Sequence, residues 1–222
     1  PISLTKSPSH VAVVLPSKYE NILSLESSKF PVSTEKYLPL KIEMFFGIRN
    51  LVLWSILYKI STLSLYTNSE VLKDNVLGII EQLRAMLVSS KHILERYGIS
   101  RNLKILIISD DSQFFILPDS YSNTPKTNVE PDFTIHLLSR LDGSPKIASV
   151  SLSLAKEYSR SELENLRADF DIFTYMSKKS YNSHPSSPSS FCLLDPQLVV
   201  LFNKTMSFNN FPCLLLKSSE VS

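Results

Sequence analysis

The chain has 222 residues with a net charge of +2, and 43% of its residues are hydrophobic. This length supports one domain with a sizeable core, and the balanced charge without a basic, aromatic-rich stripe argues against nucleic-acid binding. The four glycines lie far apart, which excludes the glycine-rich loops that bind phosphates. We therefore expect a single domain that covers residues 1–222.

The cysteines and the apolar stretches bear on the compartment of the protein. Cys192 and Cys213 offer neither a disulfide framework nor the usual spacing of a zinc site, so we expect a reducing, cytosolic setting. The longest apolar stretch, residues 44–60, is interrupted by polar residues and is too short to span a bilayer. The chain begins at Pro1 without methionine, so we expect a fragment or processed form whose membrane anchor would lie in a segment absent from this chain.

The first part of the chain alternates between short apolar runs and a helical pattern. Residues 11–15 predict a buried strand that Pro16 ends, because proline offers no N–H to a sheet. Residues 42–60 carry apolar side chains near helical spacing and predict a buried helix. Residues 61–67 alternate in polarity and predict a second strand.

Residues 70–97 form the clearest predicted helix of the chain. Their apolar side chains recur three and four positions apart, so they share one face of a helix. Ser69 is a suitable N-cap because its hydroxyl can accept a bond from a free backbone N–H. Gly98 is suited to the left-handed conformation that often follows the last helical turn.

The second part of the chain continues the alternation of strands and helices. The predicted strands are residues 103–108, 133–138 and 198–202, and the predicted helices are residues 146–158 and 161–176. Residues 177–190 are rich in serine, and we expect a mobile loop because they bury too little apolar surface to offset their ordering entropy. The pattern predicts an α/β fold with a mainly parallel central sheet of about six strands flanked by helices.

Few polar residues in these elements form a pattern that is typical of a catalytic or metal-binding site. Asp110 and Asp111 follow the third predicted strand, where they could bind a metal or act as acid and base, or simply form a solvated turn, which we prefer. His10 precedes the first strand and fits a half-buried, hydrogen-bonded histidine better than a site residue, and His136 lies inside a strand. The residues alone therefore predict no catalytic residue and no metal ligand.

Five segments, in order along the chain, share motifs with one known family. They are HVAVVL at 10–15, NLVLW and ISTLSLY within 50–66, LIISD at 106–110, FTIHLL with the Asp142-Gly143 turn at 133–143, and the stretch 198–220, with Asn210-Phe211 at an SNF position and Glu220 at a final acid. In this order and spacing they resemble cis-prenyltransferases, the family of undecaprenyl and dehydrodolichyl diphosphate synthases. The resemblance covers nearly the whole chain and implies the cis-prenyltransferase fold.

The departures from the family motifs fall on charged positions. Pro16 stands where catalytic members carry a metal-binding aspartate, and Glu20 where they carry a diphosphate-binding arginine. Two further arginines of the family fall at Leu201 and Ser207, and Gly143 is not followed by an arginine. Family catalysis uses Mg²⁺ and arginines to hold and stabilise diphosphates. The resemblance therefore implies a relative that is catalytically silent alone and binds no cofactor itself.

The same departures resemble the Nogo-B receptor-type subunit of eukaryotic dehydrodolichyl diphosphate synthase. That resemblance implies a heterodimer with a catalytic cis-prenyltransferase subunit, which would hold the Mg²⁺. The pair would act at the cytosolic face of the endoplasmic reticulum membrane, condensing isopentenyl diphosphate onto polyprenyl diphosphate for dolichol synthesis and protein N-glycosylation. This chain would be its activating subunit, and no nucleic acid would take part.

The resemblance also indicates where the partner would bind. Family members dimerise through the last strand and nearby helices, and contacts of this kind have an apolar centre. The interface candidates are Phe208, Asn210, Phe211, Leu214, Leu216 and Glu220. The silent subunit typically ends in an RxG tail, a sequence that this chain does not contain up to Ser222.

A second hypothesis is a stand-alone lipid-binding α/β module without catalysis. The apolar faces of residues 42–60 and 70–97 could line a prenyl-sized tunnel against the sheet. Alternatively, bulky residues such as Trp54 and Phe46 would fill this space as core. An open cavity there would favour the lipid-binding module, and a filled one the activating subunit.

Overall fold

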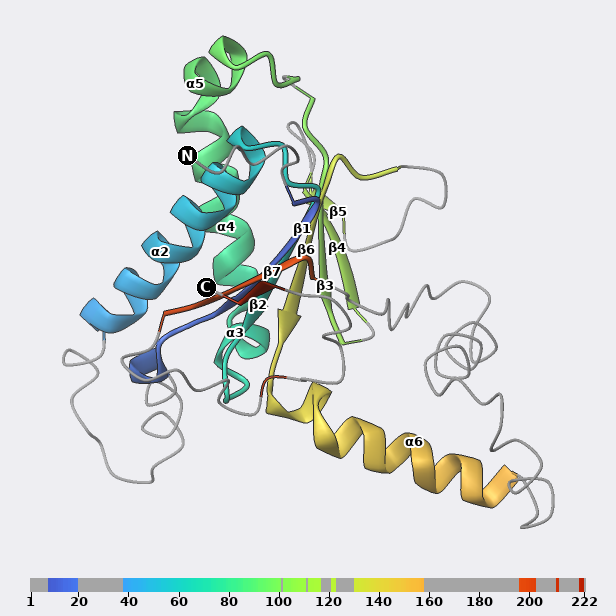
Figure 1. The fold of residues 1–222 in the computed structure, drawn as a ribbon. Helices are drawn as coiled ribbons and strands as arrows, with labels where there is room; N and C mark the ends of the chain where they lie inside the picture. Colours follow the sequence, from blue (N-terminus) through green and yellow to red (C-terminus); the bar gives the residue numbers. More distant parts are fainter. Residues whose placement is uncertain are drawn as a thin grey trace.

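A computed structural model shows an α/β fold built on one central sheet (Figure 1). The structure describes residues 8–19, 38–100, 102–110, 112–116, 121–122, 130–157, 196–202, 211 and 220–221. Within them, eight strands form the sheet in the order β5-β4-β3-β6-β2-β1-β7-β8. The strands are β1 His10–Val14, β2 Thr62–Tyr66, β3 Ile105–Ser109, β4 Ser112–Ile116, β5 Tyr121–Ser122, β6 Phe133–Leu138, β7 Leu198–Leu201 and β8 Glu220–Val221.

The direction of the strands confirms the predicted fold class. All neighbours from β3 to β8 pair in parallel, whereas β4 is antiparallel to both β3 and β5. The six strands β3-β6-β2-β1-β7-β8 are thus the mainly parallel sheet that the sequence predicted. Parallel neighbours need crossover connections, and α2 lies in the one between β1 and β2.

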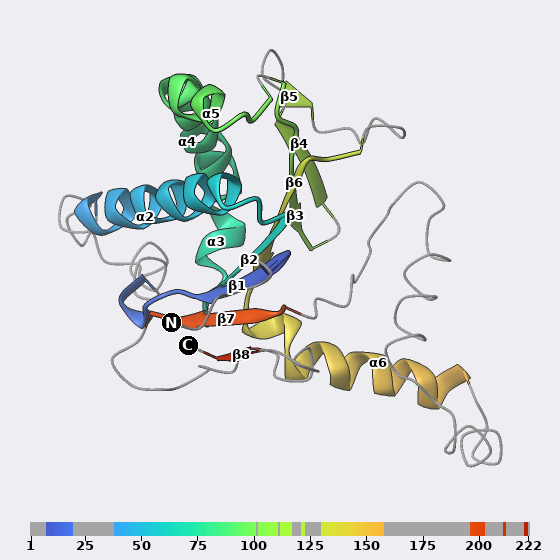
Figure 2. The ribbon, with the colours of Figure 1, turned by 45° about the horizontal axis from the view of Figure 1, so that its top comes forward.

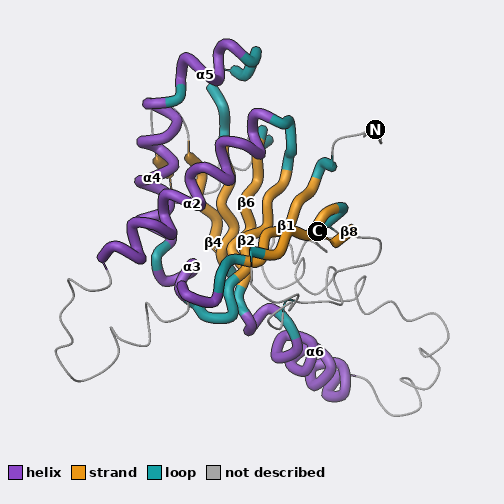
Figure 3. The backbone as a smooth tube through the Cα atoms, turned by 60° about the vertical axis from the view of Figure 1, so that its left-hand side comes forward, coloured by secondary structure: helices purple, strands orange, loops and turns teal. Residues whose placement is uncertain are grey.

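The helices lie mainly on one side of this sheet. They are α2 Leu38–Leu57, α3 Val71–Asp74, α4 Val76–Ser89, α5 Lys91–Arg96 and α6 Ser144–Glu157, with the short 3-10 helices η1 Ser17–Tyr19 and η3 Arg140–Asp142. Helices α2 and α4 run together over one face of the sheet, whereas α6 starts near the end of β6 and points away from it (Figures 2 and 3). No helix in the described ranges is long and apolar enough to cross a membrane.

The central strands are apolar on both faces, and each face has its own core. Val13, Leu65 and Ile135 point toward α2, α3 and α4 in the larger core. The alternate positions belong to a second, smaller core formed by Ala12, Val14, Tyr66, Leu138, Val199 and Phe211. This double burial is why the strands appear in the sequence as near-continuous apolar runs.

The predicted helix 70–97 is three helices, α3, α4 and α5. The first break falls at Asn75, whose side-chain amide donates to the Val71 carbonyl at 2.8 Å and competes with the helical pattern. The N-cap of α3 is Glu70 without a side-chain cap bond, so the prediction of Ser69 as N-cap is wrong. Gly98 is confirmed as the terminator, with φ of +72° and with its N–H bonded to the Glu95 carbonyl.

The polar turn after the third predicted strand is confirmed, but it belongs to a hairpin that the sequence did not predict. Ser109 of β3 pairs with Ser112 of β4, so Asp110 and Asp111 form a two-residue connection. Asp110 has φ of +50°, a left-handed conformation that two-residue hairpin turns require and aspartate tolerates. Asp111 lies outside the described residues.

The expectation that Trp54 and Phe46 fill the space under α2 is wrong. Trp54 is 59% exposed and Phe46 is 54% exposed, so both lie on the outer side of the helix. The side chains of α2 that pack toward the sheet are those of Met44, Ile48 and Val52, each at most 2% exposed. Trp54 and Phe46 lie on a different side of α2 from these residues, so they do not reach the sheet.

Candidate functional site

The parallel strands end together at one edge of the sheet. Val14, Tyr66, Leu138 and Leu201 are neighbours in register at the ends of β1, β2, β6 and β7. Open α/β sheets bind their ligands at this carboxyl edge, because the loops that follow the strands converge there. The candidate site of this protein is therefore made of the loops after β1, β2, β3, β6 and β7.

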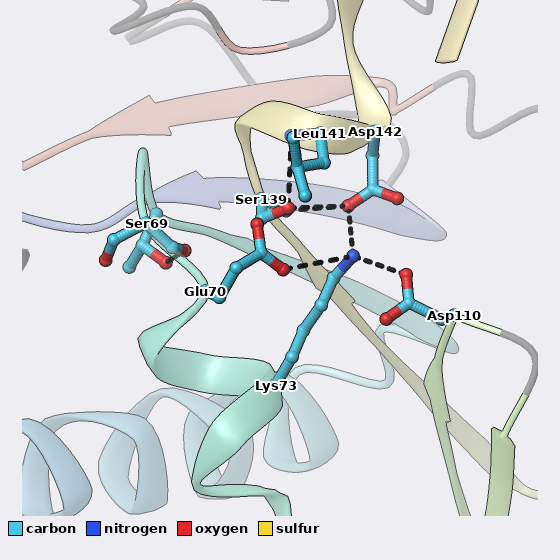
Figure 4. A network of polar contacts seen from close by, with 8 residues as sticks. Ser69, Glu70, Lys73, Asp110, Ser139, Leu141 and Asp142 are labelled. Atoms are coloured by element: carbon cyan, nitrogen blue, oxygen red, sulfur yellow. Dashed lines mark hydrogen bonds and ion pairs between the residues drawn. The ribbon is translucent and has the colours of Figure 1, made fainter. Parts of the chain in front are cut away.

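A network of ion pairs surrounds Lys73 of α3 at this edge (Figure 4). The Lys73 ammonium lies 2.5 Å from an Asp110 carboxylate oxygen, 2.7 Å from Asp142 and 3.7 Å from Glu70. The Lys73 side chain is 7% exposed. Burial alone would lower the pKa of Lys73, but the hydrogen bonds and charges of Asp110 and Asp142 outweigh it and raise the pKa. The ammonium is therefore charged at neutral pH.

Two local structures hold the partners of Lys73 in place. Thr67, buried after β2, donates from its hydroxyl to the Ser69 carbonyl at 2.8 Å and fixes the entry to α3. The buried Ser139 N-caps η3 and forms a capping box, in which the Asp142 carboxylate accepts from the Ser139 backbone N–H at 2.8 Å. Asp142 thus serves both as a cap and as the least exposed carboxylate on Lys73, at 13% exposure.

This arrangement determines what the three carboxylates can do. Carboxylates that converge at a strand edge are suitable ligands for Mg²⁺. Here the central position between Glu70, Asp110 and Asp142 is taken by the Lys73 ammonium, which is covalently attached to the chain (Figure 4). The carboxylate charges are thus used in an internal ion-pair network, which links α3 with the ends of β3 and β6.

Two of the positions at which the sequence departs from the cis-prenyltransferase motifs, Pro16 and Leu201, are described, and both are apolar. Pro16 follows β1 and Leu201 ends β7, and the two strands are neighbours with Val14 opposite Leu201. The Phe202 N–H donates to the Val14 carbonyl at 3.0 Å, which keeps the two ends together. After Pro16 the chain forms η1, and Lys18 is ion-paired with Glu43 of α2. The structure therefore brings Pro16 and Leu201 to one edge without a metal ligand or an anion-binding group at either position.

The interface candidates are only partly described. Phe211 is 3% exposed, and its ring packs edge-on against Tyr66 with centroids 5.2 Å apart. It is thus a core residue of this chain and not an exposed contact side chain. Glu220 lies in β8 opposite Leu198, at the beginning of β7, and so it is not brought together with Pro16. Outside the described residues are Glu20, Ser207, Phe208, Asn210, Leu214 and Leu216, together with the predicted helix 161–176 and the predicted loop 177–190.

The two strand histidines lie near each other on the face with the smaller core. His10 is half-buried and its Nε2 lies 2.8 Å from the Ser64 hydroxyl, which confirms the expectation of a hydrogen-bonded histidine. His136 is buried, with its ring centroid 6.5 Å from that of His10. Burial, helped by the charge of His10, lowers the pKa of His136 to about 3. His136 is therefore neutral at physiological pH and serves as a core residue.

Two charged residues of this edge were not identified from the sequence. Lys73 was hidden in the predicted helix 70–97, although Glu70 three positions earlier was a signal for an ion pair. Arg140 is exposed in η3, which follows β6, so an arginine lies three residues before Gly143 although none directly follows it. Lys73 and Arg140 lie in short helices that follow β2 and β6, and these strands are neighbours only in the folded sheet.

Comparisons with known proteins add no family assignment. Neither the models of known protein families nor the curated protein sequences gave a match to this chain. The function is therefore argued from the fold, from the chemistry of the carboxyl edge and from the sequence motifs.

Proposed function

We propose that this chain is the non-catalytic, activating subunit of a heterodimeric cis-prenyltransferase, a dehydrodolichyl diphosphate synthase. The observation that carries the proposal is the chemistry of the carboxyl edge. Pro16 and Leu201 occupy the strand ends where the family motifs carry charged residues, and the three nearby carboxylates are bound to Lys73. An edge of this composition suits a structural subunit better than a diphosphate-binding enzyme.

The physical argument concerns two diphosphates. Prenyl transfer needs Mg²⁺ and arginines to hold both diphosphates and to stabilise the one that leaves. A proline side chain cannot ligate a metal, and a leucine side chain cannot bind a phosphate. Arg140 is an exposed cation at this edge, but one guanidinium cannot replace the set of groups that this reaction requires. Mg²⁺ and the reacting diphosphates are therefore assigned to the catalytic partner.

The partner would bind at the β8 side of the sheet. β8 follows β7 at the end of the strand order, and an edge strand presents backbone groups that a second chain can pair with. We assign the contact to Phe208, Asn210, Leu214, Leu216 and Glu220, whereas Phe211 would support it from inside through Tyr66. The heterodimer would act at the cytosolic face of the endoplasmic reticulum membrane, in the synthesis of polyprenyl diphosphate for dolichol and protein N-glycosylation.

Complex formation with a purified catalytic cis-prenyltransferase subunit tests the proposal. In size-exclusion chromatography the mixture should elute as a heterodimer, and the chain should raise incorporation of radiolabelled isopentenyl diphosphate by the catalytic subunit. The double variant Leu214→Asp, Leu216→Asp should weaken both effects. The matched variant Leu77→Asp, Val88→Asp changes two exposed residues of α4 and should leave both effects intact. Absence of a complex, or equal losses in the two double variants, would contradict the assignment.

A further inference from the structure

The outer side of α2 is apolar, which is unusual for a helix that covers a sheet. Ile42 is 55% exposed, Phe46 54%, Trp54 59% and Tyr58, directly after the helix, 71%. A surface helix normally turns charged and polar side chains to solvent, opposite its buried stripe. α2 has one apolar side on the sheet and another that no described part of the chain covers. We name Ile42, Phe46, Leu53, Trp54, Leu57 and Tyr58 the outer α2 face.

The exposed apolar residues of the outer α2 face share one side of the helix. Ile42, Phe46, Trp54 and Tyr58 follow one another at intervals of four, eight and four positions. Asn50, which is partly buried, lies between Phe46 and Trp54 on this side, and Leu53 and Leu57 pack against the larger core beside it. The face runs for about 24 Å along the helix. Its four most exposed side chains present on the order of 400 Å² of apolar surface, which is in the range of functional patches.

The charged groups around the face are mostly positive. Among the described residues of α2 and its flanks, the cations are Lys18, Lys41, Arg49 and Lys59, and the one carboxylate, Glu43, is paired with Lys18. Arg49 lies over the Phe46 ring, 5.2 Å from its centroid, and donates to the Ser89 hydroxyl of α4 at 3.3 Å. Arg49 thus borders the middle of the apolar face, and Lys59 follows its C-terminal end.

We propose that the outer α2 face docks in the plane of a lipid bilayer that carries anionic headgroups. Apolar side chains in a row with Lys and Arg at their border fit the boundary between acyl chains and anionic headgroups. Trp54 and Tyr58 combine an apolar ring with a polar group, and such residues concentrate at membrane interfaces. This inference goes beyond the proposed function, because it gives the domain its own membrane contact and does not depend on the catalytic partner.

The same charges argue against a second copy of this chain as the occupant. In a two-fold symmetric contact the same patch meets itself, so the cations around the outer α2 face would approach the cations of the other copy. Like charges brought together across an interface are unfavourable, whereas anionic headgroups complement them. The positive charges around the outer α2 face therefore favour an anionic bilayer over a second copy of this chain.

Trp54 makes the proposal directly measurable, because it is the only tryptophan of the chain. The purified chain is mixed with vesicles of phosphatidylcholine alone, or of phosphatidylcholine and phosphatidylserine in equal parts. We expect co-sedimentation with the mixed vesicles, a blue shift of Trp54 emission and quenching by brominated lipids. Added salt should weaken the binding, because it screens the cations.

Variants that keep Trp54 identify the face. The double variant Ile42→Ser, Phe46→Ser should reduce the vesicle partition coefficient by about tenfold or more, since apolar burial drives such binding. The variant Lys59→Glu should weaken the preference for phosphatidylserine while it keeps the apolar face. The control variant Leu141→Ser, Leu152→Ser changes residues that are 48% and 58% exposed on η3 and α6, and it should bind as the unmodified chain does.

Several results would overturn the proposal. These are vesicle binding without a change in Trp54 emission, a loss in the Leu141, Leu152 control equal to that in the Ile42, Phe46 variant, or no vesicle binding at all. A blue shift that rises with protein concentration in the absence of lipid would point to a second copy instead. A blue shift caused only by the catalytic subunit would point to a protein partner. Stimulation of the catalytic subunit in detergent, without vesicles, tests the proposed function separately.

Discussion

The Lys73 ammonium and the Asp142 carboxylate lie 2.7 Å apart and join the helix after β2 to the turn after β6. Asp142 also caps η3, so this ion pair connects two elements that pack beside neighbouring strands. The Lys73 ammonium also pairs with Asp110, so a cation that belongs to the chain itself lies among the carboxylates at this edge of the sheet. In our proposal the charged residues at this edge stabilise the fold and do not bind a substrate.

Removal of Lys73 should be costly for the fold. The Lys73→Met variant keeps most of the side-chain volume but leaves the mostly buried Asp142 without its cation. We expect the free energy of unfolding to fall by about 3 kcal/mol, because the loss of the ammonium leaves the Asp142 carboxylate buried without a countercharge. Urea unfolding followed by circular dichroism measures this change.

Asp110 provides the matched control for that measurement. Its side chain is 58% exposed, so solvent screens its interaction with Lys73. Asp110→Asn should therefore cost less than about 1 kcal/mol. If Asp110→Asn were as damaging as Lys73→Met, or if Lys73→Met were neutral, the network would not have the structural role that we assign to it.

Acid should destabilise the protein through His136. The unfolded chain takes up a proton at this residue near its ordinary pKa of 6.5, whereas the folded chain does so only near 3. Stability is therefore present above pH 6.5 and is lost as the pH falls toward 3, by about 1.4 kcal/mol for each pH unit. His136→Leu should flatten the dependence in this range. Equal profiles for the unmodified protein and this variant would refute the assignment.

The packing of α2 on α4 can be tested with two glycines. A Cβ at Gly78 would lie 2.9 Å from the Phe45 ring, whereas a Cβ at Gly47 would meet nothing within 4 Å. Gly47→Ala should stabilise the protein by about 0.5–1 kcal/mol through helix propensity alone. Gly78→Ala should be less stable than Gly47→Ala by about 1–3 kcal/mol, because the ring must move. Thermal unfolding that ranks the two variants in the reverse order would contradict this contact.

Phe211 should anchor the last segment of the chain to the sheet. Phe211→Ala removes a buried ring from Tyr66 and should cost about 3 kcal/mol or more. Phe202→Ala truncates a ring that is 48% exposed and should cost less than about 1 kcal/mol. Because the proposed partner contact flanks Phe211, its truncation should also weaken heterodimer formation in size-exclusion chromatography. If the Phe211→Ala variant is destabilised but binds the partner with full affinity, Phe211 stabilises the fold and does not support the partner contact.

The parts of the fold that were predictable from the sequence are those with a local signal. The fourth predicted strand, residues 133–138, matches the bounds of β6, in which Phe133, Ile135 and Leu137 alternate with Thr134 and His136 at the two-residue period of a strand. β4 was missed because SQFFI begins with polar residues, and its turn is built from Asp110 and Asp111 without the glycine that usually marks a hairpin. The break at Asn75 was missed because the apolar periodicity continues through it while the side-chain amide competes for the backbone.

The candidate site was less predictable, because its residues come from segments that are distant in the sequence and meet only in the folded sheet. Asp110 was identified as the end of a strand, but its contact with Lys73 depends on β3 and β2 lying on either side of β6. Trp54 is exposed because Met44, Ile48, Val52 and Ile56 form the side of α2 that packs toward the sheet. Pro16 and Leu201 lie at one edge because Pro16 follows β1 and Leu201 ends the neighbouring parallel strand β7.

The central claim is that this chain activates a cis-prenyltransferase without catalysing prenyl transfer itself. Its most direct test is Mg²⁺-dependent incorporation of radiolabelled isopentenyl diphosphate by the chain alone, by a catalytic subunit alone and by the two together. We predict no incorporation above background for the chain alone and a higher rate for the pair than for the catalytic subunit. Robust Mg²⁺-dependent synthesis by the chain alone, or a pair no faster than the catalytic subunit, would contradict the claim.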